Sequence, residues 1–294
     1  MIKPYLQLMR PANLLTAAAD ILAGASLAPL AGLLSPFSSG QPVWLLVLST
    51  IGLYGGGVVL NDVFDAQLDA VERPERPIPS GRVPVEQASA LGVGLLALGI
   101  TLAFFYGQTS GWLALLVAGL AVFYDRFGKH QSLFGPINMG LCRGVNLLLG
   151  VSATGAGAVH QLWWLGIVPM IYIAAITMIS RDEVHGGKQR TLYFAGCLYL
   201  LVSACQLWMA SRALTLPITI GFVLLHLILI GRPLLTAIQN PVGPNIGKAV
   251  KAGVLSLIVM DAAWVSVSGN WPLALGVLLL LPLSIPVAKY FAVT

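Results

Sequence analysis

Charged residues are scarce in this chain of 294 residues, where Asp, Glu, Lys and Arg together make up only 9%. A soluble globular protein carries roughly 25% of these residues. The shortage excludes a soluble globular enzyme, because too few charged residues are present to cover its water-facing surface. It also excludes a disordered chain, because such chains are rich in charge and poor in hydrophobic residues. Hydrophobic residues at 57% and a mean hydropathy of +0.86 indicate an integral membrane protein instead.

Cysteine is also rare, and all three residues, Cys142, Cys197 and Cys205, lie inside apolar stretches. None of them has the CxxC or His/Cys spacing of a metal site. This excludes a disulfide scaffold and a zinc site, and we expect three small buried residues. The apolar stretches themselves are continuous rather than alternating, which favours helices.

Long apolar runs take the place of the missing charge. A helix needs roughly 20 apolar residues to cross the core of a bilayer. Ten runs qualify, at 12–34, 43–63, 84–106, 110–125, 134–154, 162–180, 191–211, 214–232, 247–268 and 271–291. The fourth and eighth are the weakest, and the last two could instead form one span and a re-entrant segment. The sequence therefore predicts an all-α, polytopic transmembrane bundle of nine or ten spans, as a single membrane domain covering 1–294.

The basic residues fall almost wholly on one side of these spans. With the N-terminus placed inside, the outside holds only Arg212, and Arg143 lies within a span. The inside then holds Lys3, Arg10, Arg73, Arg76, Arg82, Arg126, Lys129, Arg181, Lys188, Arg190, Arg232, Lys248, Lys251 and, with ten spans, Lys289. The net charge of +5 is therefore a topology signal and does not indicate a nucleic-acid partner. We predict a multi-pass protein of the bacterial inner (plasma) membrane with a cytoplasmic N-terminus.

An acidic motif follows the second span, where Asn61 precedes Asp62, Asp65 and Asp69. On a helix these three carboxylates share one face, and Asn61 borders it. Carboxylates so close together repel one another, and oxygen ligands without His or Cys select a hard ion such as Mg²⁺. A solvated helix end facing the cytosol is the alternative interpretation.

A basic, proline-rich loop continues from the motif over residues 72–82. Arg76 and Arg82 in this loop are suited to bind phosphate oxygens. Read alone, the loop could be only a topology signal. Next to a metal motif it favours a phosphate-bearing substrate.

Residues 61–69 followed by 76–82 resemble the first signature of the UbiA family of intramembrane prenyltransferases. Residues 10–13, 124–129 and 138–144 are similar to its start and middle. The resemblance implies a helical bundle around a central cavity, in which Mg²⁺ and two Asp-rich motifs bind an isoprenoid diphosphate. The prenyl chain then passes to an aromatic or other lipophilic acceptor, and pyrophosphate leaves. On this basis Asp62, Asp65 and Asp182 are expected to be catalytic, and Asn13, Asn61, Tyr124, Lys129 and Asn138 to bind substrate.

The family's second acidic motif has two Asp residues three or four positions apart, and this chain departs from it. Residues 180–190 offer Asp182, then Glu183, with His185 where a second carboxylate is expected. Asp182 is the better metal ligand, and Glu183 qualifies only if the loop is irregular, because adjacent helical residues point about 100° apart. Lys188 and Arg190 are expected to bind the diphosphate, and a topology signal is an equal interpretation of their charge. The run 180–187 is similar to the EboC-like branch of the family.

Two charged residues lie deep in the predicted spans. Asp20 and Arg143 are each roughly 12–13 Å along their helices from the cytoplasmic side, by a rise of 1.5 Å per residue. Their signs are opposite, so we expect them to pair or to line the cavity beneath the diphosphate. Asp261 is either an acceptor-side group or a satisfied buried acid, and the second interpretation is favoured. His226 is interpreted as a packed, hydrogen-bonded residue rather than a ligand. The run Gly55–Gly57 either lets helices approach closely or leaves room for a prenyl tail.

The predicted function is Mg²⁺-dependent transfer of a prenyl group at a site facing the cytoplasm. The alternative is a multi-pass carrier or flippase for a lipid-linked phosphate or a secondary metabolite. A carrier is expected to have an inverted repeat and broken helices at the midplane. The acidic groups gather at one face instead, which favours catalysis.

Overall fold

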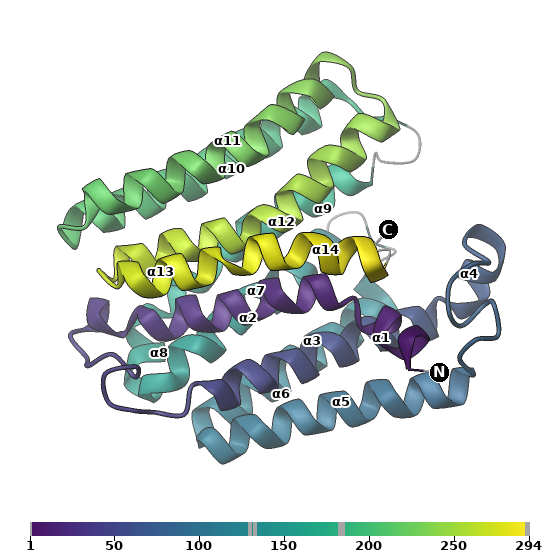
Figure 1. Ribbon diagram of the computed structural model, residues 1–294, viewed down its shortest axis with the longest axis horizontal. Helices are drawn as coiled ribbons and strands as arrows, with labels where there is room; N and C mark the ends of the chain where they lie inside the picture. The colour runs from purple at the N-terminus through teal and green to yellow at the C-terminus, as the bar shows by residue number, and fades with distance from the viewer. Residues whose placement is uncertain (1, 129–130, 132–133, 182–185, 292–294) are drawn as a thin grey trace.

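The computed structural model describes residues 2–128, 131, 134–181 and 186–291, and over these residues the ordered elements are all helical (Figure 1). The first half contains α1 (Lys3–Met9), α2 (Pro11–Ser26), α3 (Trp44–Phe64), α4 (Ala66–Glu72), α5 (Val85–Tyr106), α6 (Gln108–Phe123) and α7 (Phe134–Val151). The second half contains α8 (Ala156–Leu162), α9 (Ile167–Ser180), α10 (Gln189–Arg212), α11 (Leu216–Gln239), α12 (Gly243–Val267), α13 (Trp271–Leu278) and α14 (Leu280–Phe291). The all-α prediction is confirmed, and the single domain over 1–294 stays a prediction.

Within the described ranges, nine helical segments are long and apolar enough to cross a membrane. They are Pro11–Ala31, Trp44–Phe64, Val85–Tyr106, Gln108–Gly128, Ala156–Ser180, Gln189–Arg212, Leu216–Gln239, Gly243–Val267 and Trp271–Phe291. The predicted span 134–154 is α7, which falls outside this set because Asn138, Arg143 and Asn146 interrupt its apolar surface. These polar residues are tolerated because α7 packs against α2, α6 and α9, so protein surrounds its polar side. The prediction of nine or ten spans is confirmed.

Glycines set the closest helix contacts in the bundle. A Cβ on Gly56 of α3 would lie 2.7 Å from the Gly92 carbonyl oxygen of α5. On the other side of the bundle, a Cβ on Gly24 of α2 would lie 2.2 Å from the Leu147 carbonyl oxygen of α7. Such contacts between backbones are possible only where the side chain is a hydrogen atom. The close-approach interpretation of the Gly55–Gly57 run is therefore confirmed at Gly56.

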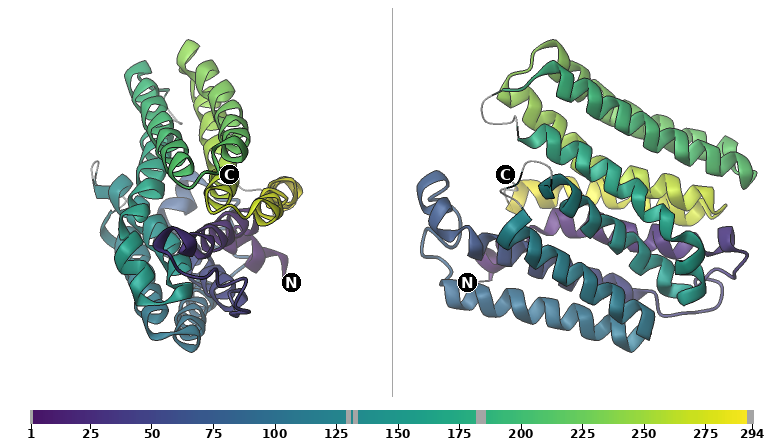
Figure 2. Two further views of the ribbon diagram at one scale, coloured as in Figure 1. Left: turned by 90° about the vertical axis from the view of Figure 1, so that its left-hand side faces the viewer. Right: turned by 180° about the vertical axis from the view of Figure 1, so that it is seen from behind.

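The second half packs on the first through α9 on α7 and through α12 and α14 on α2. The helix α12 is central to the second half. This helix contacts α2, α9 and α11, while α10 and α11 form a pair that stands apart from the first helices (Figure 2). A large buried cluster surrounds α12, with the indole of Trp264 fully enclosed. The arrangement leaves a space between α2, α3, α6, α7, α9 and α12, where the cavity described below lies.

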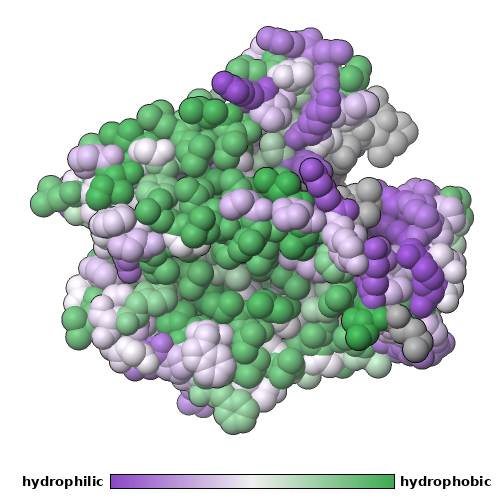
Figure 3. All heavy atoms as spheres, viewed as in Figure 1, coloured by the Kyte–Doolittle hydropathy of each residue, from purple (hydrophilic) through white to green (hydrophobic). Residues whose placement is uncertain are grey.

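The polar surface is concentrated at one end of the bundle. Apolar side chains cover most of the face in Figure 3, and hydrophilic ones gather over α4, its following loop and the turn between α11 and α12. Exposed residues there include Glu72, Arg73, Glu75 and Arg82. This end carries the N-terminus and the acidic motif (Figure 1), so the predicted gathering of polar chemistry on one side is present in the fold.

Candidate active site

A cavity of about 500 Å³ runs through the centre of the bundle. Its walls comprise charged and polar residues at the polar end, an apolar and aromatic middle, and a second polar group deeper inside. The polar end contributes Arg10, Asn13, Asn61, Asp65, Tyr124 and Asp125; the middle includes Leu53, Tyr54, Gly57, Val117, Ile176 and Leu257; the inner group is Thr16, Thr50, Arg143 and Asn146. A cavity of this kind suits a long molecule with one charged end and an apolar body.

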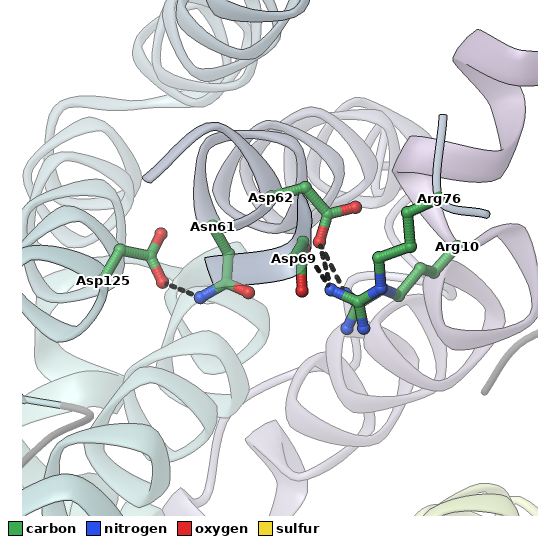
Figure 4. A network of polar contacts seen from close by, with 6 residues as sticks. All are labelled: Arg10, Asn61, Asp62, Asp69, Arg76 and Asp125. Carbon is green, nitrogen blue, oxygen red and sulfur yellow. Dashed lines mark hydrogen bonds and ion pairs between the residues drawn. The ribbon is translucent and has the colours of Figure 1, made fainter. Parts of the chain in front are cut away.

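Two carboxylates of the acidic motif are held by arginines. Asp62 Oδ1 accepts from the Arg10 guanidinium at 2.8 Å and from Arg76 at 3.4 Å, and Asp69 Oδ2 accepts from Arg76 at 2.7 Å (Figure 4). Both carboxylates are buried, with 5% and 4% of their residue surfaces exposed. Arg76, predicted to bind phosphate, thus stands between two acids and offsets their repulsion.

Asp65 has a different orientation from its two neighbours. The helix divides at Asp65 into α3 and α4, although the Asp65 and Asp69 amides still donate to the Asn61 and Asp65 carbonyls. Asp65 lines the cavity, whereas Asp62 and Asp69 face the arginines. The three carboxylates therefore do not share one face, and the prediction that they do is wrong. Asp62 and Asp69, which were expected to share a metal ion, share the positive charge of Arg76.

Asp125 is a site residue that the sequence reasoning missed. It lies on the π-helical turn Tyr124–Gly128 after α6, is 4% exposed and lines the cavity. Its Oδ1 accepts from Asn61 Nδ2 at 2.8 Å, so the amide oxygen of Asn61 faces away from Asp125 (Figure 4). The sequence did contain a signal for Asp125: this acid comes at the end of a predicted apolar span, as Asp62 does.

The donor set at the polar end fits a hard cation. Asn61, Asp65 and Asp125 offer only oxygen ligands to the cavity, the type that Mg²⁺ prefers. Among the described residues, no three His, Cys, Asp or Glu side chains are close enough to hold an ion by themselves. An ion at this position would need further oxygens, such as those of a diphosphate. The predicted ligands Asp182 and Glu183 and the predicted substrate residue Lys129 lie outside the described residues, as does His185.

Three other predicted substrate residues lie away from the cavity lining. Arg82 is exposed and donates hydrogen bonds within its own loop, to Ser80 Oγ at 2.9 Å and to the Glu75 carbonyl. It also donates to Gln7 Oε1 of α1 at 3.3 Å. Lys188 is exposed just before α10. Asn138 is buried and donates to the Leu120 carbonyl at 3.1 Å, which ties α7 to α6. Their roles in substrate binding stay predictions.

The predicted pairing of Asp20 with Arg143 is confirmed. Arg143 Nε lies 2.6 Å from Asp20 Oδ2, and the two terminal nitrogens donate to Thr16 Oγ1 at 3.1 Å and to the Thr16 carbonyl at 2.6 Å. Asn146 donates to Asp20 Oδ2 at 2.9 Å and accepts from Thr50 Oγ1 at 2.7 Å. Arg143 lines the cavity, and the fully buried Asp20 lies behind it.

A family model described as the UbiA prenyltransferase family matches residues 21–249 of the chain. The chain is also similar to a digeranylgeranylglyceryl phosphate synthase of Ignicoccus hospitalis, with 34% identity over 185 residues. That match covers 63% of the chain and 58% of the relative, so it spans less than two thirds of the relative's length.

Two solved structures have a similar fold. One is a digeranylgeranylglyceryl phosphate synthase, with a TM-score of 0.62 and 22% identity, covering 91% of this chain and 99% of the other. The second is a UbiA homologue from Archaeoglobus fulgidus bound to GPP and Mg²⁺, with a TM-score of 0.60 and 15% identity, covering 86% and 99%. At these identities the similarity establishes the polytopic helical fold.

Proposed function

Since the chain belongs to the UbiA prenyltransferase family, we propose that it transfers a prenyl group from an isoprenoid diphosphate to an aromatic or other lipophilic acceptor. The reaction depends on Mg²⁺ and releases pyrophosphate. The observation that carries the proposal is the central cavity, which joins oxygen ligands and Arg10 at one end to an apolar body. The Archaeoglobus fulgidus neighbour, bound to GPP and Mg²⁺, supports the same class of donor.

Mg²⁺ would be held by Asp65 and Asn61, together with Asp182 from the second acidic loop. When bound, it supplies a Lewis acid that neutralises charge on the departing diphosphate. Asp62 and Asp69 position the two arginines beside this site, and Asp125 orients the Asn61 amide. These fixed charges act more strongly next to an apolar cavity than in water.

The middle of the cavity would hold the prenyl chain and keep the allylic cation from water. Leu53, Val117, Ile176 and Leu257 supply an apolar wall, and the rings of Tyr54 and Tyr124 also face the cavity. Aromatic faces attract cations, so the two tyrosines are placed to stabilise a developing allylic charge. Gly57 adds no side chain to this wall, which supports the second interpretation of the glycine run, that it leaves room for a prenyl tail.

The site faces the cytoplasm in this proposal, because the polar end carries the basic loops that the positive-inside rule assigns to that side. The alternative, a carrier or flippase, has less support, since the family match is to a family of enzymes. The named relative is an archaeal protein, and the bacterial inner membrane stays a prediction.

Binding and turnover of geranyl diphosphate test the proposal. Calorimetry on the purified full chain in detergent should show binding that requires Mg²⁺. Incubation with labelled geranyl diphosphate and a lipid extract should then give a labelled lipophilic product and pyrophosphate. We expect Asp65→Asn to lose the Mg²⁺-dependent binding, and the exposed neighbour Glu72→Gln to keep it. Equal binding with and without Mg²⁺, or full turnover by Asp65→Asn, would contradict the proposal.

A further inference from the structure

The inner end of the cavity is polar, although it lies deep among transmembrane helices. Thr16, Thr50, Arg143 and Asn146 line it from α2, α3 and α7. Thr50 is eleven residues before Asn61 on the same helix, so it lies roughly 16 Å from Asn61 at 1.5 Å per residue. Thr16 is only three residues after Asn13 on α2, so the inner group extends from Thr50 back toward the polar end. An apolar prenyl tail gains nothing from such a surface, so a different part of the substrates is expected to meet it.

Arg143 is held rigidly in this inner group and retains donors for a ligand. A guanidinium has five N–H donors. In the described part of the chain, Nε faces Asp20, and each terminal nitrogen makes one hydrogen bond to Thr16. One N–H on each terminal nitrogen is left over. A donor pair fixed in advance loses little entropy when it binds a carbonyl or hydroxyl oxygen.

The charge of the group excludes an anionic ligand. Asp20 neutralises Arg143 at 2.6 Å. The carboxyl of Asp261, from α12, lies against that of Asp20, and no other described residue donates a hydrogen bond to it. With Asp20 ionised in its pair with Arg143, the net charge of these three side chains is zero, and it is negative when Asp261 is ionised as well. A phosphate or carboxylate brought here would lose its hydration without gaining an unpaired cation.

We propose that this inner group binds a neutral hydrogen-bonding substituent of the acceptor, such as a hydroxyl or a carbonyl, and thereby sets acceptor selectivity. The inference rests on the proposed prenyl transfer. The diphosphate occupies the polar end, and the prenyl chain lies along the apolar wall in the middle of the cavity. The acceptor lies beside this chain, with its nucleophile toward the allylic carbon and its polar substituent at the inner group. Arg143 and Thr50 contact the acceptor, and Asp20 is a positioning residue that acts through Arg143.

A purely structural role for the network makes a different prediction. The same hydrogen bonds connect α2, α3 and α7. If they served only to hold these helices together, the residues would not need to line the cavity. Its loss would lower stability and affect every acceptor alike. The selectivity between a neutral and an anionic acceptor therefore separates the two roles.

Two phenols of similar size serve as probes and differ in one substituent: 2-(4-hydroxyphenyl)ethanol has a neutral hydroxyl group, and 4-hydroxyphenylacetate has a carboxylate anion. The purified full chain is loaded with Mg²⁺ and geranyl diphosphate, and kcat/KM is measured for each probe. The wild type should favour the neutral probe at least tenfold. Asp20→Asn leaves Arg143 charged and unpaired, so the ratio should shift toward the anion at least tenfold. His226→Gln, a buried polar change away from the cavity lining, is the matched control and should keep the wild-type ratio.

Thr50→Val is a second variant for the case that Asp20→Asn does not fold. It removes one hydroxyl from the inner group, should raise KM for the neutral probe several-fold, and should leave the Kd of geranyl diphosphate unchanged. The proposal is overturned if a folded Asp20→Asn keeps the wild-type ratio, if Thr50→Val has no effect on KM, or if the loaded wild type binds neither probe. Failure of the wild type to bind geranyl diphosphate with Mg²⁺ would instead refute the proposed function.

Discussion

Arg76 bridges Asp62 and Asp69, with its Nη1 at 3.4 Å from the first carboxylate and 2.7 Å from the second. The side chains of Asp62, Asp69 and Arg76 are 7%, 6% and 13% exposed, so the ion pairs are shielded from water. Removing one partner of a buried ion pair costs roughly 3–5 kcal/mol, because the remaining charge is left uncompensated.

We therefore expect Arg76→Gln to destabilise the polar end of the protein and to lower the thermal midpoint. Arg76→Lys should recover part of the loss, since it keeps the charge but cannot bond to both carboxylates in the same geometry. Thermal unfolding in detergent, with and without Mg²⁺, checks both variants. A midpoint for Arg76→Gln equal to that of wild type would show that the bridge contributes nothing to the fold.

Asp125 should control the metal affinity through Asn61. Its carboxylate fixes which way the Asn61 amide points, and loss of a partner that orients a metal ligand typically weakens binding 10–100-fold. We expect Asp125→Ala to weaken Mg²⁺-dependent binding of geranyl diphosphate within this range. Asp125→Asn keeps an oxygen acceptor and should weaken it less. Calorimetry measures both, and equal affinities for wild type and Asp125→Ala would contradict the role.

The contact between α2 and α7 should be intolerant of any side chain at Gly24. A Cβ there would lie 2.2 Å from the Leu147 carbonyl, so the two helices must separate. Overpacking of this kind costs roughly 1–3 kcal/mol. We expect Gly24→Ala to lower the thermal midpoint, and Gly94→Ala on α5, where nothing lies within 4 Å of the added carbon, to leave it unchanged. Similar midpoints for the two variants would contradict the packing argument.

Much of the fold and part of the site followed from the sequence. The spans were predictable because burial in lipid demands long apolar runs, and the pairing of Asp20 with Arg143 followed from helical rise and opposite charge. The exception among the spans was α7, whose neighbours allow it to be polar. A local pattern carries no information about which helices surround a given segment.

The details of the acidic motif were not predictable for a similar reason. The division of the helix at Asp65 and the bridge by Arg76 depend on how the loop over residues 72–82 folds back. Asp125 was missed because its partner Asn61 lies 64 positions away in the chain. Helical spacing predicts which residues share a face of one helix, but it cannot predict that a residue of α3 contacts one at the end of α6.

The side of the membrane on which the polar end lies can be tested by labelling. Glu75 and Ser39 are exposed on opposite sides of the span Trp44–Phe64. In a background without the three native cysteines, we expect Ser39→Cys to react with a membrane-impermeant maleimide in intact cells, and Glu75→Cys to react only after the membrane is opened. The reverse pattern would place the N-terminus outside.

The length of the prenyl chain should depend on the side chain at position 57. Gly57 lines the cavity, and a Cβ there would lie 3.3 Å from the Ala121 Cβ, so a small side chain fits only by narrowing the space. We expect Gly57→Val to reduce kcat/KM for farnesyl diphosphate more than for geranyl diphosphate, because the longer chain needs more of the cavity. Mg²⁺-dependent binding of inorganic pyrophosphate should stay unchanged, since the metal ligands are not altered. An equal loss for both prenyl donors would place their chains outside this part of the cavity.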